Sequence, residues 1–318
     1  MKVMQNKFKL VFFGSPFFAS YSLENLIKAG FHITAVVTQP PKIKGRNQVK
    51  TETDLAKIAQ KHNLKTITPE IFNDDIFAEL KNLSADAFIV VAYGKIIPQT
   101  ILNLPPHGVI NIHPSLLPKY RGPSPVQTAL LNNEKITGVS IMKIDNKVDH
   151  GPILFQVSEQ INDDDNNIIL TDRLFQIGAK YLPDILWKYL HKNLTPQPQD
   201  DNLATYTKLI KKQDGLINWL DEAVYINQQI KAYQPWPTAY SYCQNVLYKF
   251  YKSKIIKGKL PPGKIIVDKK NRQLLVGTGK DLLSVDIIQP EGKNKLPIKD
   301  FILGYNLDGL FFTTHPKT

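Results

Sequence analysis

NIHPSLLPKYRG, at residues 111–122, is the stretch around which this chain is organised. The three residues before it, Gly-Val-Ile, are small or apolar, as at the end of a buried strand. Because side chains alternate along a strand, Asn111 and His113 are predicted to point to the same face. Two prolines within the stretch remove backbone donors and disfavour helix before them. The segment after His113 is therefore predicted to be an extended, rigid wall that suits a flat ligand.

Strand and helix patterns alternate on both sides of this stretch. Strands are predicted at residues 9–13, 33–38, 87–92 and 136–143, and helices at residues 18–29, 54–62, 75–83, 126–132 and 171–190. This alternation is typical of an α/β fold with a doubly wound, mostly parallel sheet, a Rossmann-like architecture. Gly14 is not followed by the further glycines that approach a pyrophosphate, and no acidic residue closes the second strand. NAD binding is therefore disfavoured.

The second half of the chain changes character. Residues 193–205 are mostly polar and contain prolines, so they are predicted to link a catalytic domain at 1–192 to a second domain at 206–318. After a predicted helix at 221–233, short alternating segments separated by turn residues follow at 246–252, 254–256, 263–267, 274–277 and 282–288. This pattern predicts a small, OB-like β-barrel.

Composition and charge narrow the class of partner. The 318 residues include 40 Lys+Arg and 28 Asp+Glu, which gives a formal net charge of +12. Residues 244–300 hold thirteen Lys/Arg against five Asp/Glu, so most of the positive balance lies in the predicted barrel. Such an excess favours a polyanionic partner, and nucleic acid is favoured over a membrane because no basic amphipathic helix stands out.

Cysteine usage and the first residues of the sequence bear on the compartment. Cys243 is the only cysteine, which excludes an internal disulfide framework and a cysteine-rich metal site. The first apolar run ends at Gly14 and is too short for a secretory segment or a membrane span. We therefore expect a cytoplasmic protein that has no membrane partner. A monomer is also expected, although neither observation bears on the oligomeric state.

A basic loop follows the second predicted strand. Residues 39–50 contain Lys42, Lys44, Arg46 and Lys50 and no acidic residue. The loop leaves the carboxyl end of a parallel strand, where α/β folds place their ligands. It is predicted to contact the phosphates of a nucleic acid.

A second strand end and turn lie downstream, where Asp149 is followed by His-Gly-Pro. The pattern Asn-x-His-x-Ser-Leu-Leu-Pro from Asn111, followed by Asp-x-Gly from Asp149, resembles the folate-dependent formyltransferases. The resemblance extends from about residue 10 to about residue 305 and is strongest to members that act on methionyl-tRNA. His150, where the family usually has a small residue or Thr, and Pro-Ser at 123–124, in place of Ala-Ala, depart from the family pattern.

The resemblance implies a reaction for which the polar residues are suited. Formyl transfer from a folate nitrogen to an amine needs a polarised carbonyl, a stabilised oxyanion and a proton transfer. Asn111 can donate its amide to the oxyanion, His113 can donate or shuttle a proton, and Asp149 can hold the imidazole and accept a proton. Asp145 competes for the acidic role, and the Asp-x-Gly match favours Asp149.

The resemblance also implies ligands. 10-Formyltetrahydrofolate would be the donor, contacted by Ser115, Leu116, Leu117 and Pro118 and by the pterin-lining segment with Tyr93 and Gly94. The acceptor would be the α-amino group of methionyl initiator tRNA. The basic loop would match the family's loop that enters the acceptor stem, with Arg46 at the position of that loop's important arginine. Residues 41–44 differ from the family's usual residues in that loop.

Other functions remain open at this point. A formyltransferase acting on a small amine, such as a sugar nucleotide or a purine precursor, would share the signature but gives no reason for the basic loop and barrel. A nucleic-acid-binding protein with an inactive core is disfavoured because all three polar residues are present. Ser115 lacks a nucleophile-elbow motif, and the scattered histidines give too few ligands for metal catalysis, so neither a covalent mechanism nor a metal is expected.

Overall fold

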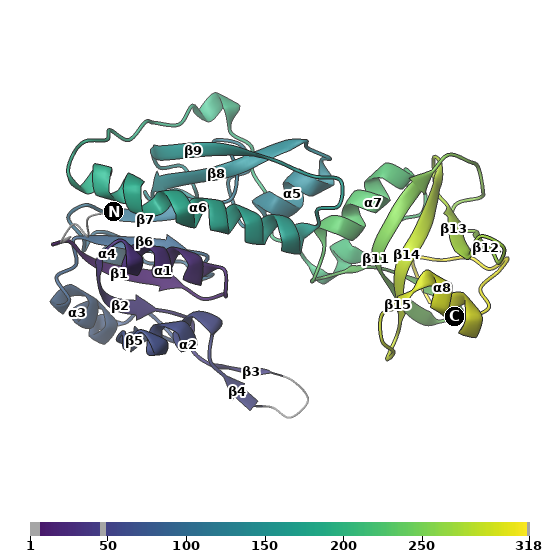
Figure 1. Cartoon of the computed structure of the whole chain (residues 1–318), viewed down its shortest axis with the longest axis horizontal. Coiled ribbons are helices and arrows are strands. Elements are labelled where there is room, and N and C mark those ends of the chain that lie inside the picture. Colours follow the sequence, from purple (N-terminus) through teal and green to yellow (C-terminus); the bar gives the residue numbers. More distant parts are fainter. Residues whose placement is uncertain (1–6, 45–48, 317–318) are drawn as a thin grey trace. The chain divides into compact units, whose positions relative to one another are not determined.

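The computed structural model describes residues 7–44 and 49–316 (Figure 1). The chain forms two compact units. The first comprises residues up to 122, 136–160 and 171–206, and the second comprises 123–135, 161–170 and the residues from 207 onward. The domains predicted at 1–192 and 206–318, with a linker at 193–205, remain a prediction.

A seven-stranded sheet forms the centre of the first unit, in the order β5-β2-β1-β6-β7-β8-β9. The strands from β5 to β7 pair in parallel, whereas β8 and β9 join as antiparallel strands, so the sheet is mostly parallel as predicted. The bounds are β1 Lys9–Gly14, β2 His32–Val37, β5 Thr66–Ile67, β6 Ala87–Val91, β7 Val109–His113, β8 Ile136–Lys143 and β9 Ile153–Gln160.

Helices cover both faces of this sheet, as a doubly wound fold requires. Their bounds are α1 Ala19–Lys28, α2 Asp54–Lys61, α3 Asp74–Asn82, α4 Gln99–Leu102 and α6 Asn167–Leu190. Helices α1 and α6 lie side by side (Figure 1), and the Asn25 amide of α1 donates to the Ala179 carbonyl of α6. On the other face, Leu80 of α3 and Ile101 of α4 share a core with Phe88 of β6 and Val109 of β7.

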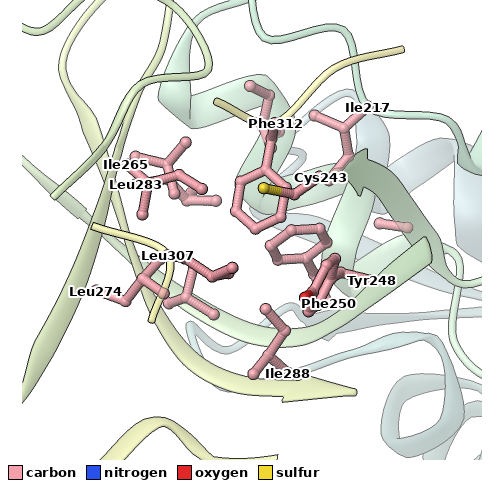
Figure 2. Close-up of a cluster of buried hydrophobic side chains, with 14 of the residues drawn as sticks. Ile217, Cys243, Tyr248, Phe250, Ile265, Leu274, Leu283, Ile288, Leu307 and Phe312 are labelled. Atoms are coloured by element: carbon pink, nitrogen blue, oxygen red, sulfur yellow. The ribbon is translucent and has the colours of Figure 1, made fainter. Parts of the chain in front are cut away.

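The second unit is built on an antiparallel sheet in the order β10-β11-β14-β13-β12, with β15 paired to β14. Its elements are α5 Pro125–Leu131, α7 Ala223–Ala232, β10 Ala239–Cys243, β11 Val246–Ile256, β12 Ile265–Asp268, β13 Gln273–Gly277, β14 Leu282–Pro290, β15 Leu296–Pro297 and α8 Ile298–Gly304. Phe250 and Phe312 pack edge to face in its core with ring centroids 5.2 Å apart (Figure 2). Cys243, the one cysteine, is buried in the same cluster (Figure 2).

A C-terminal segment connects the two edges of this sheet. The backbone amide of Thr313 donates to the carbonyl of Tyr242 on β10. On the opposite edge, the amide of Gly309 donates to the carbonyl of Ile265 on β12. One segment thus pairs with both edge strands, and this antiparallel sheet is consistent with the small barrel predicted from sequence.

Several predicted elements need correction. β11 is one strand, where two were predicted, because register shifts on both sides of Lys252 let a single strand bend at a bulge. The basic loop contains a hairpin that was not predicted, formed by β3 Lys42–Lys44 and β4 Val49–Thr51. The alternation of Lys and Ile in β3 is compatible with a strand but too short to indicate one. α6 begins at Asn167, four residues before the predicted start at 171. β9 and β10 were not predicted at all.

Within the described part of the chain, no helix is both long enough and apolar enough to span a lipid bilayer.

Candidate active site

The predicted strand before the signature is β7, which carries both Asn111 and His113. Ile112 between them faces α6, where a Cβ on Gly178 would lie 2.7 Å from its Cγ2. Asn111 and His113 therefore lie on the opposite face, as the alternation predicted. His113 is 4% exposed, whereas Asn111 is half-buried and its side chain makes no hydrogen bond with residues 7–44 or 49–316.

The segment after His113 is a tight turn, and the prediction of an extended wall was wrong. Residues 114–120 bend and turn, and Leu117–Pro118 is a cis peptide bond. Ser115 donates from its hydroxyl to the carbonyl of Lys119 at 2.7 Å, which stabilises the turn. The hydrogen bond from the Ser115 hydroxyl to a backbone carbonyl four residues later stabilises a turn, and the prolines are compatible with it.

Two polar residues of the antiparallel strands hydrogen-bond to this turn, of which Ser140 is buried and Gln156 is exposed. The hydroxyl of Ser140 on β8 donates to the carbonyl of Ser115 at 2.6 Å and accepts from the amide of Leu117 at 3.1 Å. The Gln156 amide on β9 donates to the carbonyl of Leu117 at 2.8 Å. Neither residue was predicted from the sequence, although a serine inside the apolar strand 136–143 indicated a buried polar contact.

His113 and Asp149 meet, although they are distant in sequence. Nδ1 of His113 lies 3.6 Å from Oδ2 of Asp149, and the two side chains are 5% and 19% exposed. Nε2 of His113 lies 3.0 Å from the carbonyl oxygen of Tyr120. Because a carbonyl only accepts, Nε2 carries a proton, and proton exchange is left to Nδ1, which faces the carboxylate.

The turn that presents Asp149 is shaped by backbone geometry. Asp149 has a φ of +48°, in the left-handed region, and its Oδ2 accepts a hydrogen bond of 2.8 Å from the amide of Gly122. The loop leaves β8 and returns to β9 so closely that a Cβ on Gly151 would lie 1.9 Å from the Lys143 carbonyl oxygen. Only glycine fits at this closure.

We expect Gly151→Ala to lower the free energy of unfolding by about 1–3 kcal/mol, because the added methyl group overpacks the junction of β8 and β9. The midpoint of thermal unfolding measures this effect. Gly304→Ala is the matched control, since a Cβ added to this glycine of helix α8 would meet nothing within 4 Å. Equal midpoints for the two variants would contradict the expectation.

A network of charged and polar side chains adjoins the Asp149 turn. Arg121 is 1% exposed, and its Nη2 donates to Oδ1 of Asp201 at 2.8 Å. His150, the residue that departs from the family pattern, lies between two carboxylates, with Nδ1 2.6 Å from Asp145 and Nε2 3.3 Å from Asp201. Asp145, the alternative acid, is thus engaged with His150, whereas Asp149 faces His113.

The two members of the Arg121–Asp201 pair shift each other's titration. Burial alone would lower the pKa of Arg121, but the hydrogen bonds with Asp201 and Tyr206 outweigh it and raise the pKa. The hydrogen bond from Arg121 lowers the pKa of Asp201, and the charge of His150 adds to the effect. Asp201 was missed in the sequence because nothing local links residue 201 to residue 121.

The predicted folate contacts lie in different surroundings. Leu116 packs on β8, where a Cβ on Gly138 would lie 2.5 Å from its Cδ2, and Leu117 is buried. The ring of Tyr93 is buried against Phe13, at 5.6 Å between centroids, and burial raises the pKa of Tyr93 to about 12. Gly94 has a φ of +76°. Ser115, Leu116, Leu117, Pro118, Tyr93 and Gly94 remain predicted folate contacts.

The predicted tRNA contacts are only partly described. Lys42 and Lys50 are exposed on the hairpin, and Nζ of Lys42 donates to Oε1 of Gln39 at 2.7 Å. Lys44 ends β3, while Arg46 lies outside the described residues. In the described parts of the chain, no three His, Cys, Asp or Glu side chains gather as a metal site would require. The expectation of a reaction without a metal remains a prediction.

Comparisons with known proteins identify the family. Residues 8–186 match the formyl transferase family, and residues 209–306 match the formyl transferase C-terminal domain. A methionyl-tRNA formyltransferase of Thermodesulfovibrio yellowstonii is 44% identical over 94% of this chain and 96% of its own. The chain belongs to the methionyl-tRNA formyltransferase family. The resemblance stated from the signature is confirmed.

Other members of the family and solved structures agree. The methionyl-tRNA formyltransferase of Roseiflexus sp. is 41% identical over 95% of this chain and 94% of its own. The sugar 3N-formyl transferase WlaRD, solved with dTDP and 5-N-formyl-THF, aligns with a TM-score of 0.65 at 22% identity, over 90% of this chain and 99% of its own. HypX from Aquifex aeolicus, solved with tetrahydrofolic acid, aligns with a TM-score of 0.66 at 15% identity, over 95% of this chain and 48% of its own. At these identities the solved structures support the fold.

Proposed function

We propose that this enzyme transfers the formyl group of 10-formyltetrahydrofolate to the α-amino group of methionyl initiator tRNA. The observation that carries the proposal is the match to methionyl-tRNA formyltransferases along both parts of the chain, at 44% identity. His113 and Asp149 lie close enough to act on one proton, 3.6 Å apart, which supports the same reaction.

Asn111 is proposed to stabilise the oxyanion that forms when the amine attacks the formyl carbon. Asn111 is half-buried in β7, two residues before the strand ends, and its side chain has no hydrogen-bond partner within residues 7–44 and 49–316. An amide that is held by a strand and not engaged elsewhere is available to a carbonyl oxygen of a substrate. This unengaged donor is also the feature that fits a formylated folate.

Asp149 and His113 are proposed to handle the proton. The attacking amine loses a proton as the new bond forms, and the leaving folate nitrogen gains one. Asp149 is a carboxylate whose Oδ2 faces Nδ1 of His113 at 3.6 Å, so it accepts the proton from the amine with the imidazole beside it. His113 keeps its Nε2 proton on Tyr120 and therefore uses Nδ1 to stabilise or return that proton.

The basic parts of the chain are proposed to bind the tRNA. Residues 244–300, most of which lie in the antiparallel unit, contain thirteen Lys/Arg against five Asp/Glu. A basic surface of this kind binds a phosphate backbone by releasing counterions. A small acceptor, such as an amino sugar, gives no physical reason for such an excess.

The direct test incubates the purified protein with 10-formyltetrahydrofolate and methionyl initiator tRNA. We expect N-formylmethionyl-tRNA, with much slower transfer to elongator methionyl-tRNA under the same conditions. A sugar nucleotide that carries an amino group is the second control. Transfer to that sugar, with none to either tRNA, would overturn the proposal in favour of the small-amine alternative.

Arg46→Ala is expected to raise KM for methionyl-tRNA about tenfold, because a contact to phosphate is lost, and to leave hydrolysis of the folate donor unchanged. Initial rates at varied tRNA, and release of formate without tRNA, measure the two effects. Lys28→Ala, at the end of α1, removes a cation elsewhere and serves as the control. A KM that is unchanged in Arg46→Ala would remove this residue from the proposed interface.

A further inference from the structure

We propose that Gln199 is a positioning residue that holds Asp149 against His113 during formyl transfer. This inference rests on the proposed function and extends it to a residue outside the signature. Gln199 belongs to the segment predicted as a linker at 193–205. Its side chain joins Arg121, at the end of the signature stretch, to the turn that carries Asp149.

Gln199 uses its whole amide group in this contact. Its Nε2 donates to the carbonyl of Asp149 at 2.9 Å and to the carbonyl of Gly151 at 2.7 Å. Its Oε1 accepts from Nε of Arg121 at 3.0 Å and from Nη2 at 2.8 Å. One side chain therefore binds the turn of Asp149 and the end of the signature stretch at once.

Arg121 fixes the orientation of that amide. A guanidinium only donates and a backbone carbonyl only accepts, so the Gln199 oxygen must face Arg121 and its NH₂ must face the Asp149 turn. Arg121 is itself 1% exposed and held by Asp201 at 2.8 Å. The amide can neither rotate nor be replaced by a carboxylate without losing two hydrogen bonds.

The other side-chain contacts of the Asp149 turn are those of His150 with Asp145 and Asp201 and of Asp145 with the amide of Lys147, and none of them involves the two carbonyls that Gln199 binds. Residues 146–148 are exposed at its tip, and Asp149 adopts a left-handed φ of +48°, which costs free energy for a residue other than glycine. The carboxylate is held directly by the amide of Gly122 at 2.8 Å. The carbonyls on which Gln199 acts belong to Asp149 and to the glycine that closes the turn. Loss of the Gln199 amide is therefore expected to let Oδ2 move away from Nδ1 of His113.

The decisive variant is Gln199→Glu, which keeps the acceptor for Arg121 but replaces both donors with oxygen. We expect kcat for formyl transfer to fall about 10²-fold, as a small misplacement of a reacting group does. KM for tRNA and for the folate donor should change less than threefold, because the Gln199 amide is already engaged with Arg121 and with the carbonyls of the Asp149 turn. If Gln199→Glu does not fold, Gln199→Met, which is neutral and similar in length, carries the same expectation.

Gln197→Glu is the matched control, with the same change of charge two residues earlier. The backbone of Gln197 pairs with Ile153, with hydrogen bonds of 2.7 and 2.8 Å, but its side chain is exposed. Its kcat should equal that of the wild type. A loss of the same size in both variants would overturn the proposal, since the cause would be charge on the segment.

A double-mutant cycle separates positioning from general support of the fold. In an Asp149→Asn background, Gln199→Glu should lower kcat no further, because Gln199 acts through the carboxylate that is already gone. Multiplication of the two effects would overturn the proposal. Amide hydrogen exchange of the peptide 144–152 is the readout that needs no activity, and it should be faster in Gln199→Glu than in Gln197→Glu.

These measurements distinguish failure of the proposed function from failure of the positioning role of Gln199. A wild-type protein that transfers no formyl group to methionyl-tRNA would contradict the proposed function, while faster exchange at 144–152 would still support the hold of Gln199 on the turn. An active wild type whose Gln199→Glu variant retains full kcat and unchanged exchange would overturn the positioning role alone.

Discussion

Asp149→Asn is expected to lower kcat for formyl transfer about 10²–10⁴-fold, the range for loss of a general acid–base group, with little change in KM for either substrate. Asparagine has the size of aspartate, tolerates the left-handed φ of +48°, and its Oδ1 still accepts from the Gly122 amide at 2.8 Å. The substitution thus removes the proton acceptor beside His113 and preserves the turn. Single-turnover rates with saturating tRNA measure the chemical step.

Asp145→Asn is the matched control for this prediction. Asp145 lies in the same turn but binds Nδ1 of His150 at 2.6 Å and the amide of Lys147 at 2.9 Å. Its kcat should fall less than tenfold. If Asp145→Asn were the slower enzyme, the acidic role would pass to Asp145, which the sequence alone also allowed.

The core of the candidate site could be predicted because strand geometry is local. Asn111 and His113 share a face through simple alternation along β7, and Ile112 packs against α6 on the other face. The approach of Asp149 to within 3.6 Å of His113 depends on the pairing of β7 with β8, in which Asn111 is opposite Met142. A buried strand that ends just before the Asp149 turn was visible in the sequence.

The residues that hold the site could not be predicted in the same way. Gln199 and Asp201 reach Arg121 across about eighty residues of sequence, in a segment whose polar composition indicates only a linker. Gln156 was missed with its strand, β9, because ILFQVSEQ begins with three apolar residues, ends with three polar ones and alternates only around Gln156 and Val157. The turn at 114–120 was mispredicted because a proline pattern restricts φ but does not show where serine hydroxyls donate.

Asn111→Ala is expected to lower kcat about 10²–10³-fold, the usual loss when one oxyanion-hole donor is removed. The free energy of unfolding should hardly change, because the Asn111 side chain has no hydrogen-bond partner within residues 7–44 and 49–316. Its backbone pairing with Val90 and Met142 does not depend on the side chain. Parallel measurements of kcat and of the thermal midpoint test both halves of this expectation.

A comparison of Asn111→Asp with Asn111→Ala tests whether the amide acts on the oxyanion. Asn111→Asp has the size of the wild-type residue but presents a carboxylate where negative charge develops on the substrate oxygen. It should therefore be slower than Asn111→Ala, since repulsion is added to the loss of a donor. If Asn111 served only to shape the end of β7, the aspartate, which matches it in shape, would be the faster variant. The order of these two rates therefore decides whether the amide acts on the oxyanion or on the fold.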